Sequence, residues 1–283
     1  MAVHFRPMGT RPTVAILGAG AIGEALALGL LAAGWTPEDL ALAGRRPERC
    51  REVEESTGVP CLLDPATVAS GRDVVVVAVK PADVPGLLAQ LTGRISDDQV
   101  LLTLAAGVPI AVFERAFPGA AVIRAMPNTP AQIAEGMTVM AAGSGAGDDA
   151  VSRAQTVLEA VGRTLVLDEG VLDAVTAVSG TGPAYVFLLA EALTESAIRE
   201  GIPWHAVEQL VAQTLRGAGM LLAASDASPA RLRAQVTSPG GTTAAAIHVL
   251  EERGFRAIVE DAVRAAAQRS REMGESAARG SPS

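Results

Sequence analysis

The sequence is poor in cysteine and in aromatic residues. Phe, Trp and Tyr make up 3% of the 283 residues, and the two cysteines are Cys50 and Cys61. Neither cysteine lies in a Cys-x-x-Cys or metal-ligand spacing, so we interpret both as reduced thiols and expect no metal site. Tyr185 is the only tyrosine, and no Tyr-x-x-x-Lys pair exists. This argues against the short-chain dehydrogenases.

Long apolar runs and an excess of positive charge are also missing. No uninterrupted apolar stretch is long enough to span a bilayer, so we expect no membrane association. The net charge of −8 argues against a nucleic-acid partner, and an anionic ligand would need a local basic site. Residues 1–11 hold no apolar core of signal-peptide length, which predicts a cytoplasmic protein, and residues 274–283 are expected to be frayed.

The three histidines provide no obvious acid or base. His4, His205 and His248 show no spacing with carboxylates or a serine that would suggest a triad or a metal centre. Hydride transfer without a strong acid suits a substrate that is already basic and easily protonated, such as an imine.

Short apolar runs alternate with helix-like segments in the first part of the chain. The clearest run is Val74–Val77, four valines in succession, as in a strand that is buried on both faces of a parallel sheet. The alternation is typical of a doubly wound α/β domain. The expected strands are 13–17, 40–43, 59–63, 73–79, 100–104, 120–123 and 136–140.

From about Asp168 the pattern changes to long segments rich in Ala, Leu and Glu, and we predict helices over 183–200, 205–224 and 244–273. Their apolar faces are broad, which indicates burial against a second copy of the chain. The predicted fold class is therefore α/β, with an N-terminal Rossmann doubly wound domain over 1–167 and an all-α dimerisation domain over 168–283.

A Gly-x-Gly-x-x-Gly turn follows the first expected strand and opens a helix. In such a turn the first glycine permits the tight bend, the second lets a pyrophosphate approach the backbone, and the third lets helix and strand pack closely. The turn therefore predicts a dinucleotide site. Its residues are Gly18, Ala19, Gly20, Ala21, Ile22 and Gly23.

The end of the second expected strand indicates which nicotinamide cofactor binds. An NAD site normally carries an acid there for the ribose hydroxyls, but this chain has Arg45 and Arg46. Arginines can pair with a 2′-phosphate, so NADPH is predicted, with NADH as the weaker alternative. The competing interpretation is that the two arginines only begin a solvated helix.

Ligands of open α/β sheets lie at the carboxyl ends of the strands, which draws attention to three turns. The turns are Ala78–Pro81, Ala105–Gly107 and Met126–Pro130. Lys80, in the first of them, could equally be a solvated lysine at a helix start.

Two glycine-rich segments stand out in the second half, Ser179–Tyr185 and Thr237–Thr243. Glycines, hydroxyls and free amides before a helix can form a cradle for an anion. The alternative for each segment is an ordinary helix-capping loop.

Over residues 16–273 the sequence resembles the pyrroline-5-carboxylate reductases. The resemblance rests on the glycine turn, on Ala78–Pro81 and Met126–Pro130, and on the two glycine-rich segments of the second half. The most specific segment is Thr237–Thr243, which in that family holds the substrate carboxylate. The resemblance implies NADPH-dependent hydride transfer to the imine carbon of 1-pyrroline-5-carboxylate, which becomes C5 of the product L-proline, as the last step of proline biosynthesis. It also implies a homodimer, and the rings of dimers known in the family admit a decamer of five dimers.

The resemblance further implies a role for particular residues. Thr243 is placed near the imine nitrogen as the catalytic residue. The expected substrate-binding residues are Ser238, Gly240, Gly241, Thr242, Thr243 and Glu169. The expected cofactor-binding residues are Gly18, Ala19, Gly20, Ala21, Ile22, Gly23, Arg45, Arg46, Asp64, Ala78, Val79, Lys80, Pro81, Ala106 and Gln235.

Two rival functions fit these residues less well. A hydroxy-acid dehydrogenase of similar plan would want a catalytic lysine in the first helix of the second domain, and none lies between Pro183 and Glu195. A sensor that binds NADPH without turnover would have no need of the second anion site at Ser238–Thr243.

Overall fold

The structure, a computed structural model, describes residues 11–279, and side chains up to Glu275. Expectations for residues 1–10 and 280–283 lie outside the described residues. The chain divides into two compact units: one holds the residues up to Thr181 and those from Ala266 onward, and the other holds Gly182–Ala265. The expected division at 167/168 falls inside the first of these units.

The first unit contains an eight-stranded sheet with the order β3-β2-β1-β4-β5-β6-β7-β8. Neighbouring strands are parallel except β6 and β7, which are antiparallel. The reversal of strand order beside β1 places β1 and β4 at the switch point, where ligands bind in such sheets. The strands are β1 (Val14–Leu17), β2 (Leu40–Ala43), β3 (Cys61–Leu62), β4 (Val74–Val77), β5 (Val100–Thr103), β6 (Ala121–Met126), β7 (Gly136–Ala142) and β8 (Gly162–Val166).

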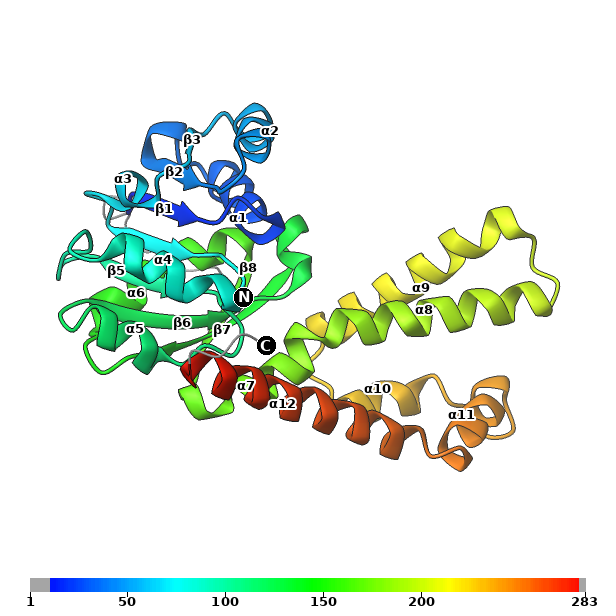
Figure 1. The fold of residues 1–283 in the computed structure, drawn as a ribbon. Coiled ribbons are helices and arrows are strands. Elements are labelled where there is room, and N and C mark those ends of the chain that lie inside the picture. Colours follow the sequence, from blue (N-terminus) through cyan, green and yellow to red (C-terminus); the bar gives the residue numbers. More distant parts are fainter. Residues whose placement is uncertain (1–10, 280–283) are drawn as a thin grey trace. The chain divides into compact units, whose positions relative to one another are not determined.

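Both faces of this sheet are covered by helices (Figure 1). Alternate residues of one strand point to opposite sides: Val14 and Ile16 belong to one apolar cluster, and Ala15 and Leu17 belong to the other. The first cluster includes residues of α1 (Ala21–Ala32), α2 (Pro47–Thr57) and α6 (Asp148–Leu158). The second includes residues of α3 (Pro65–Ala69), α4 (Val84–Leu91) and α5 (Ile110–Ala116). This is the doubly wound arrangement that the valine-rich runs predicted.

The first unit ends in short helical pieces. A 3-10 turn at Glu169–Val171 leads into α7 (Leu172–Val175) and then into a π-helical turn at Thr176–Gly180. The other 3-10 turns are Pro37–Asp39, Pro81–Asp83, Thr129–Ile133 and Glu159–Val161.

The second unit is helical, as predicted. Within it α8 (Gly182–Arg199) packs against α9 (Trp204–Ala224), and α10 (Pro229–Gln235) and α11 (Thr242–Glu252) follow. The single helix expected over 244–273 is wrong, because the chain breaks between α11 and α12 (Phe255–Arg279). Gly254 adopts φ 74° at the break, a left-handed conformation that ends a helix and that glycine accepts without strain.

In the first unit one strand was missed and one further expectation is wrong. Strand β8 was not predicted: it lies at the sheet edge and is partly exposed, so its residues lack the apolar pattern of the inner strands. The frayed segment expected from Gly274 is instead helical to Arg279. Gly274 is buried against Gly107, and a Cβ added at Gly274 would lie 2.4 Å from the Gly107 carbonyl oxygen.

Large apolar side chains remain exposed on the helices of the second unit. Phe187 and Leu188 on α8 are 61% and 65% exposed, and Met220 on α9 is 59% exposed. By length and composition one helical stretch, Glu169–Arg199, could cross a membrane, although Glu191 and Glu195 interrupt it. Exposed apolar faces of this extent mark a surface that something else covers.

Candidate cofactor site

The glycine turn lies between β1 and α1, and two of its glycines are required by close backbone contacts. Gly18 has φ 134°, and a Cβ there would lie 2.4 Å from the Ala78 carbonyl oxygen. A Cβ on Gly23 would lie 2.0 Å from the Gly18 carbonyl oxygen. Gly20 differs, because a Cβ added there would meet nothing within 4 Å. The turn is thus tightly packed against the protein, and Gly20 faces open space where a pyrophosphate could approach the backbone.

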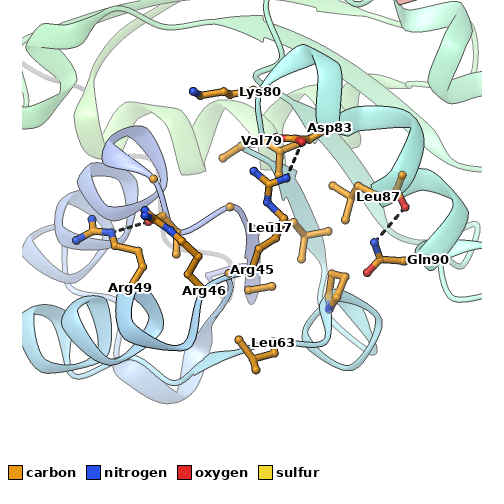
Figure 2. A pocket seen from close by; sticks show the side chains of 18 of the residues that line it. Leu17, Arg45, Arg46, Arg49, Leu63, Val79, Lys80, Asp83, Leu87 and Gln90 are labelled. Atoms are coloured by element: carbon orange, nitrogen blue, oxygen red, sulfur yellow. Dashed lines mark hydrogen bonds and ion pairs between the residues drawn. The ribbon is translucent and has the colours of Figure 1, made fainter. Parts of the chain in front are cut away.

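A cavity of about 920 Å³ opens beside this turn, at the carboxyl ends of β1, β2 and β4 (Figure 2). Its volume is in the range of ligand and cofactor sites. Leu17, Leu63, Val79 and Leu87 give it apolar walls. The remaining lining residues are Gly18, Ala19, Gly20, Ala43, Gly44, Arg45, Arg46, Arg49, Pro65, Ala78, Lys80, Ala82, Asp83, Gly86 and Gln90.

The charged groups of the cavity are mostly basic. Its lining includes four basic residues, Arg45, Arg46, Arg49 and Lys80, and one acid, Asp83. In a chain whose net charge is −8, such a cluster selects for an anionic ligand. The Arg45 Nη1 donates to the Asp83 Oδ1 at 2.7 Å, and the Arg45 side chain is 77% exposed. Arg45 is therefore held at the mouth of the cavity by a solvent-screened ion pair that a phosphate could displace.

Two buried thiols lie under the same end of the cavity. A Cβ added at Gly44 would lie 2.6 Å from the Cys50 Sγ and 3.7 Å from the Cys61 Sγ. Burial, together with the hydrogen bond and charge of Cys50, raises the pKa of the Cys61 thiol to about 12. Both cysteines are free thiols.

The structure brings many of the predicted cofactor residues to this cavity, but not all of them. Those that line it are Gly18, Ala19, Gly20, Arg45, Arg46, Ala78, Val79 and Lys80. Ala21, Ile22 and Gly23 continue into α1, and Pro81 begins the 3-10 turn after β4; none of these four is among the lining residues. Ala106 lies in the turn after β5, next to Gly107.

Asp64 is also absent from the lining, because its carboxylate caps α3. The Asp64 side chain accepts from the Thr67 hydroxyl at 2.6 Å and from the Ala66 amide at 3.1 Å. These hydrogen bonds, the Thr67 one foremost, hold the pKa of Asp64 below its usual range. Its neighbours Leu63 and Pro65 line the cavity instead.

Glu169, predicted to bind substrate, is engaged within the first unit. Its Oε1 accepts from the Ile110 amide at 2.8 Å and from the Arg124 Nη1 at 3.0 Å. The Arg124 side chain is 8% exposed, so the pair neutralises a buried guanidinium, while the same carboxylate oxygen accepts from the first amide of α5. To bind substrate, the Glu169 carboxylate would have to do so beside its contacts with Ile110 and Arg124. The substrate role of Glu169 stays a prediction.

The predicted carboxylate cradle lies in the second unit, in the loop between α10 and α11. Gly240 has φ 71°, and the Gly241 amide donates to the Ser238 carbonyl at 3.0 Å. A Cβ on Gly241 would lie 2.4 Å from the Ser238 Oγ, so only glycine lets this hydroxyl fold over the start of α11. Thr242 and Thr243 form the first turn of α11, and Gly241 at its N-cap offers their amides no side-chain acceptor. Gln235, the last residue of α10, is exposed in the same unit.

The turn after β6 is tied to the π-helical turn. The Asn128 Nδ2 donates to the Ser179 carbonyl and hydroxyl oxygens, both at 3.3 Å, and its Oδ1 accepts from the Met137 amide at 2.9 Å. Asn128 thereby connects the turn Met126–Pro130 with the beginning of the segment Ser179–Tyr185. Its role in the first unit is to hold these two segments together.

Several lining residues were missed from the sequence. Arg49 lies inside α2, and Asp83, Leu87 and Gln90 follow the turn after β4. A search for motifs at strand ends does not reach them, because each lies some residues beyond its strand. For Arg49, Asp83 and Leu87 the available signal was their place at the beginning of the helices that follow β2 and β4, whereas Gln90 lies in the last turn of α4.

The fold and the cavity define a class: this is a Rossmann-type oxidoreductase whose basic cavity suits a phosphorylated nicotinamide dinucleotide. The family model described as "NADP oxidoreductase coenzyme F420-dependent" matches residues 13–107, and the model for "Pyrroline-5-carboxylate reductase dimerisation" matches residues 169–273. The pyrroline-5-carboxylate reductase of Mycobacterium tuberculosis is 42% identical over 92% of this chain and 96% of its own. The chain therefore belongs to the pyrroline-5-carboxylate reductase family.

Solved structures agree with this assignment. The pyrroline-5-carboxylate reductase of Coxiella burnetii matches with a TM-score of 0.87 and 32% identity, over 93% of this chain and 99% of that one. The pyrroline carboxylate reductase of Plasmodium falciparum, solved with NADP bound, matches with a TM-score of 0.83 and 27% identity, over 93% and 98% of the two chains. The predicted family, fold class and cofactor type are confirmed.

Proposed function

We propose that this protein reduces 1-pyrroline-5-carboxylate to L-proline with NADPH. The observation that supports this most is the basic cavity behind the glycine turn, in a chain related over nearly its whole length to enzymes named for this reaction. A relative solved with NADP bound supports the choice of cofactor. NADH is the weaker alternative, because the cavity offers arginines where an NAD site offers an acid.

In the proposed site the glycine turn and the start of α1 hold the pyrophosphate, and Arg45 and Arg46 hold the 2′-phosphate. Bound NADPH would supply a hydride to the imine carbon, which is C2 of 1-pyrroline-5-carboxylate and becomes C5 of proline. The electron pair of the C=N bond moves to nitrogen, which takes up a proton, so the product is the saturated ring. Substrate placement carries the catalysis, because a cyclic imine needs no strong protein acid to accept hydride.

We assign the substrate carboxylate to the loop at Ser238–Thr243. The Ser238 hydroxyl, the first-turn amides of α11 and the positive end of that helix suit an anion. The Thr243 hydroxyl is proposed to hydrogen-bond the imine nitrogen as the catalytic group, with Gly240 and Gly241 shaping the loop. Glu169 and Gln235 keep secondary roles, the first toward substrate and the second toward cofactor.

We further propose that the protein is a cytoplasmic homodimer and that a second copy, rather than lipid, covers the exposed apolar helices. The match of residues 169–273 to a dimerisation family supports this, since these residues hold Phe187, Leu188 and Met220. A decamer of five dimers is the larger assembly that the family resemblance admits.

An isotope experiment tests the reaction itself. NADPH that carries deuterium at the transferred position of C4 should deliver the label to C5 of proline when 1-pyrroline-5-carboxylate is supplied. Proline without the label, or NADPH oxidised without proline formation, would contradict the proposal. The same assay without enzyme measures any background exchange.

A further inference from the structure

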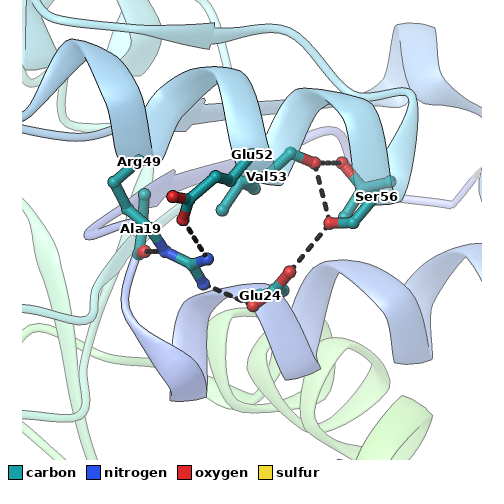
Figure 3. A network of polar contacts seen from close by, with 7 residues as sticks. Ala19, Glu24, Arg49, Glu52, Val53 and Ser56 are labelled. Carbon is teal, nitrogen blue, oxygen red and sulfur yellow. Dashed lines mark hydrogen bonds and ion pairs between the residues drawn. The ribbon is translucent and has the colours of Figure 1, made fainter.

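Three arginines line the cofactor cavity, and Arg49 differs from the other two in its contacts. The Arg45 side chain is 77% exposed, whereas that of Arg49 is 26% exposed and contacts three acceptors. The Arg49 Nε donates to the Ala19 carbonyl oxygen at 2.9 Å, and Nη1 pairs with Glu52 at 3.0 Å. Its Nη2 pairs with Glu24 (Figure 3). With its donors used in this way, Arg49 is a fixed part of the cavity wall.

The contact with Ala19 controls the direction of a backbone amide. Ala19 and Gly20 share a peptide bond inside the glycine turn, and the C=O and N–H of a trans peptide point in opposite directions. By holding the Ala19 carbonyl, Arg49 fixes the plane of this peptide and the direction of the Gly20 amide. Gly20 is the position that faces open space, where a pyrophosphate would approach.

The contact with Glu24 concerns charge. Glu24 lies in the first turn of α1, close to the helix end that would receive the phosphates. The Ser56 hydroxyl donates to Glu24 Oε1 at 2.7 Å. This hydrogen bond, followed by the hydrogen bond and the charge of Arg49, lowers the pKa of Glu24, so the carboxylate is ionised at neutral pH. Without Arg49, an uncompensated negative charge would face an incoming diphosphate.

We infer that Arg49 is a positioning residue for dinucleotide binding, which locks the Ala19–Gly20 peptide and neutralises Glu24 but does not select the 2′-phosphate. This role rests on the proposed NADPH-dependent function. This role separates Arg49 from its neighbours. Loss of the Arg45 or Arg46 side chain should weaken binding of NADPH only, whereas loss of the Arg49 side chain should weaken binding of the diphosphate that NADPH and NADH share.

The test measures dissociation constants of NADPH and NADH for the full-length protein by nucleotide fluorescence, beside thermal unfolding of each variant. Arg49→Gln should weaken binding of both nucleotides by about tenfold, the effect of losing one charge-assisted hydrogen bond, here that from the Gly20 amide to the diphosphate, with the ratio of the two dissociation constants unchanged. Arg49→Lys, which keeps the charge, should lose less. Glu24→Gln combined with Arg49→Gln should recover part of the loss, because the unpaired carboxylate is gone.

The matched control is Arg51→Gln, which makes the same change on the same helix. Arg51 is 67% exposed and is not part of the cavity lining, so both dissociation constants should stay as in the wild type. A loss confined to NADPH in Arg49→Gln would overturn the inference and make Arg49 a ligand of the 2′-phosphate. Unchanged binding of both nucleotides would overturn it as well.

The variants also distinguish a folding defect from a binding defect. If Arg49→Gln does not fold, Arg49→Lys and the double variant are measured in its place. Arg49→Lys keeps a positive charge beside Glu24, and the double variant removes the carboxylate, so neither variant leaves an unpaired negative charge at this position. A double variant no better than Arg49→Gln would refute the neutralising role. Wild-type protein that binds neither nucleotide would overturn the proposed function itself, a failure that differs from one seen only in the variants.

Discussion

The preference for NADPH should depend on Arg45 and Arg46, and the double change Arg45→Asp with Arg46→Ala should abolish it. Both side chains line the cavity, and no acid lies at the end of β2. The introduced carboxylate would repel a 2′-phosphate and could accept hydrogen bonds from the ribose hydroxyls of NADH. We therefore expect weaker NADPH binding and unchanged or tighter NADH binding.

The size of the effect follows from the contacts. A charge-assisted hydrogen bond to phosphate contributes roughly 1.5–3 kcal/mol. For Arg45 this gain is offset by the loss of its exposed pair with Asp83, which is worth about 0–1 kcal/mol. A net change of about 0.5–3 kcal/mol corresponds to a fall of roughly 2- to 150-fold in the NADPH to NADH ratio.

The assay is kcat/KM for each nucleotide at saturating imine substrate, with the dissociation constants measured in parallel. Asp83→Asn provides an internal check: with its partner neutral, Arg45 is released and NADPH binding should tighten while NADH binding changes little. An unchanged NADPH to NADH ratio in the arginine double variant would refute the assignment. The two arginines would then be no more than a solvated helix start.

Three further predictions concern other parts of the protein. Ser238→Ala should raise KM for the imine, and Thr243→Ala should raise KM and also lower kcat; a change in KM alone for Thr243→Ala would show that its hydroxyl binds without helping proton delivery. Leu188→Asp alters a side chain that is 65% exposed in the single chain, so it should leave folding intact but abolish dimerisation and activity in sedimentation and rate measurements; an active monomer would refute the proposed interface. The pKa of Cys61 is raised to about 12, whereas that of an unfolded thiol is near 8.5, so the contribution of Cys61 to the free energy of unfolding is complete below about pH 8.5. Between there and pH 12 this free energy should decline by up to about 1.4 kcal/mol per pH unit. Cys61→Ala should lack this decline in denaturant titrations at alkaline pH, and an identical decline in the variant would contradict the burial of the thiol.

Sequence patterns predicted the sheet well where strands are buried on both faces. Val74–Val77 shows this, since four successive apolar residues leave little alternative to a central parallel strand. Strand β8 was missed because it lies at the edge of the sheet and is partly exposed, so its residues do not form the apolar run of a buried strand. The break at Gly254 escaped because the residues on both sides favour helix, and only the φ of one glycine separates α11 from α12.

The cofactor site was predictable where a motif fixes the backbone. Gly18 and Gly20 are positioned by the strand, turn and helix that the pattern itself defines. Arg49 and Asp83 were missed because their contribution depends on side-chain direction from the following helices. Asp64 was predicted from the family resemblance, which does not reveal that its carboxylate caps α3.

The most direct test of the account is a comparison of substrates under NADPH-dependent turnover. The protein should oxidise NADPH with 1-pyrroline-5-carboxylate, forming one proline per NADPH, and should act less efficiently on the six-membered cyclic imine and not at all on an open-chain 2-oxo acid. Turnover of the 2-oxo acid in preference to the cyclic imine would contradict the account, as would tight NADPH binding without any oxidation in the presence of 1-pyrroline-5-carboxylate.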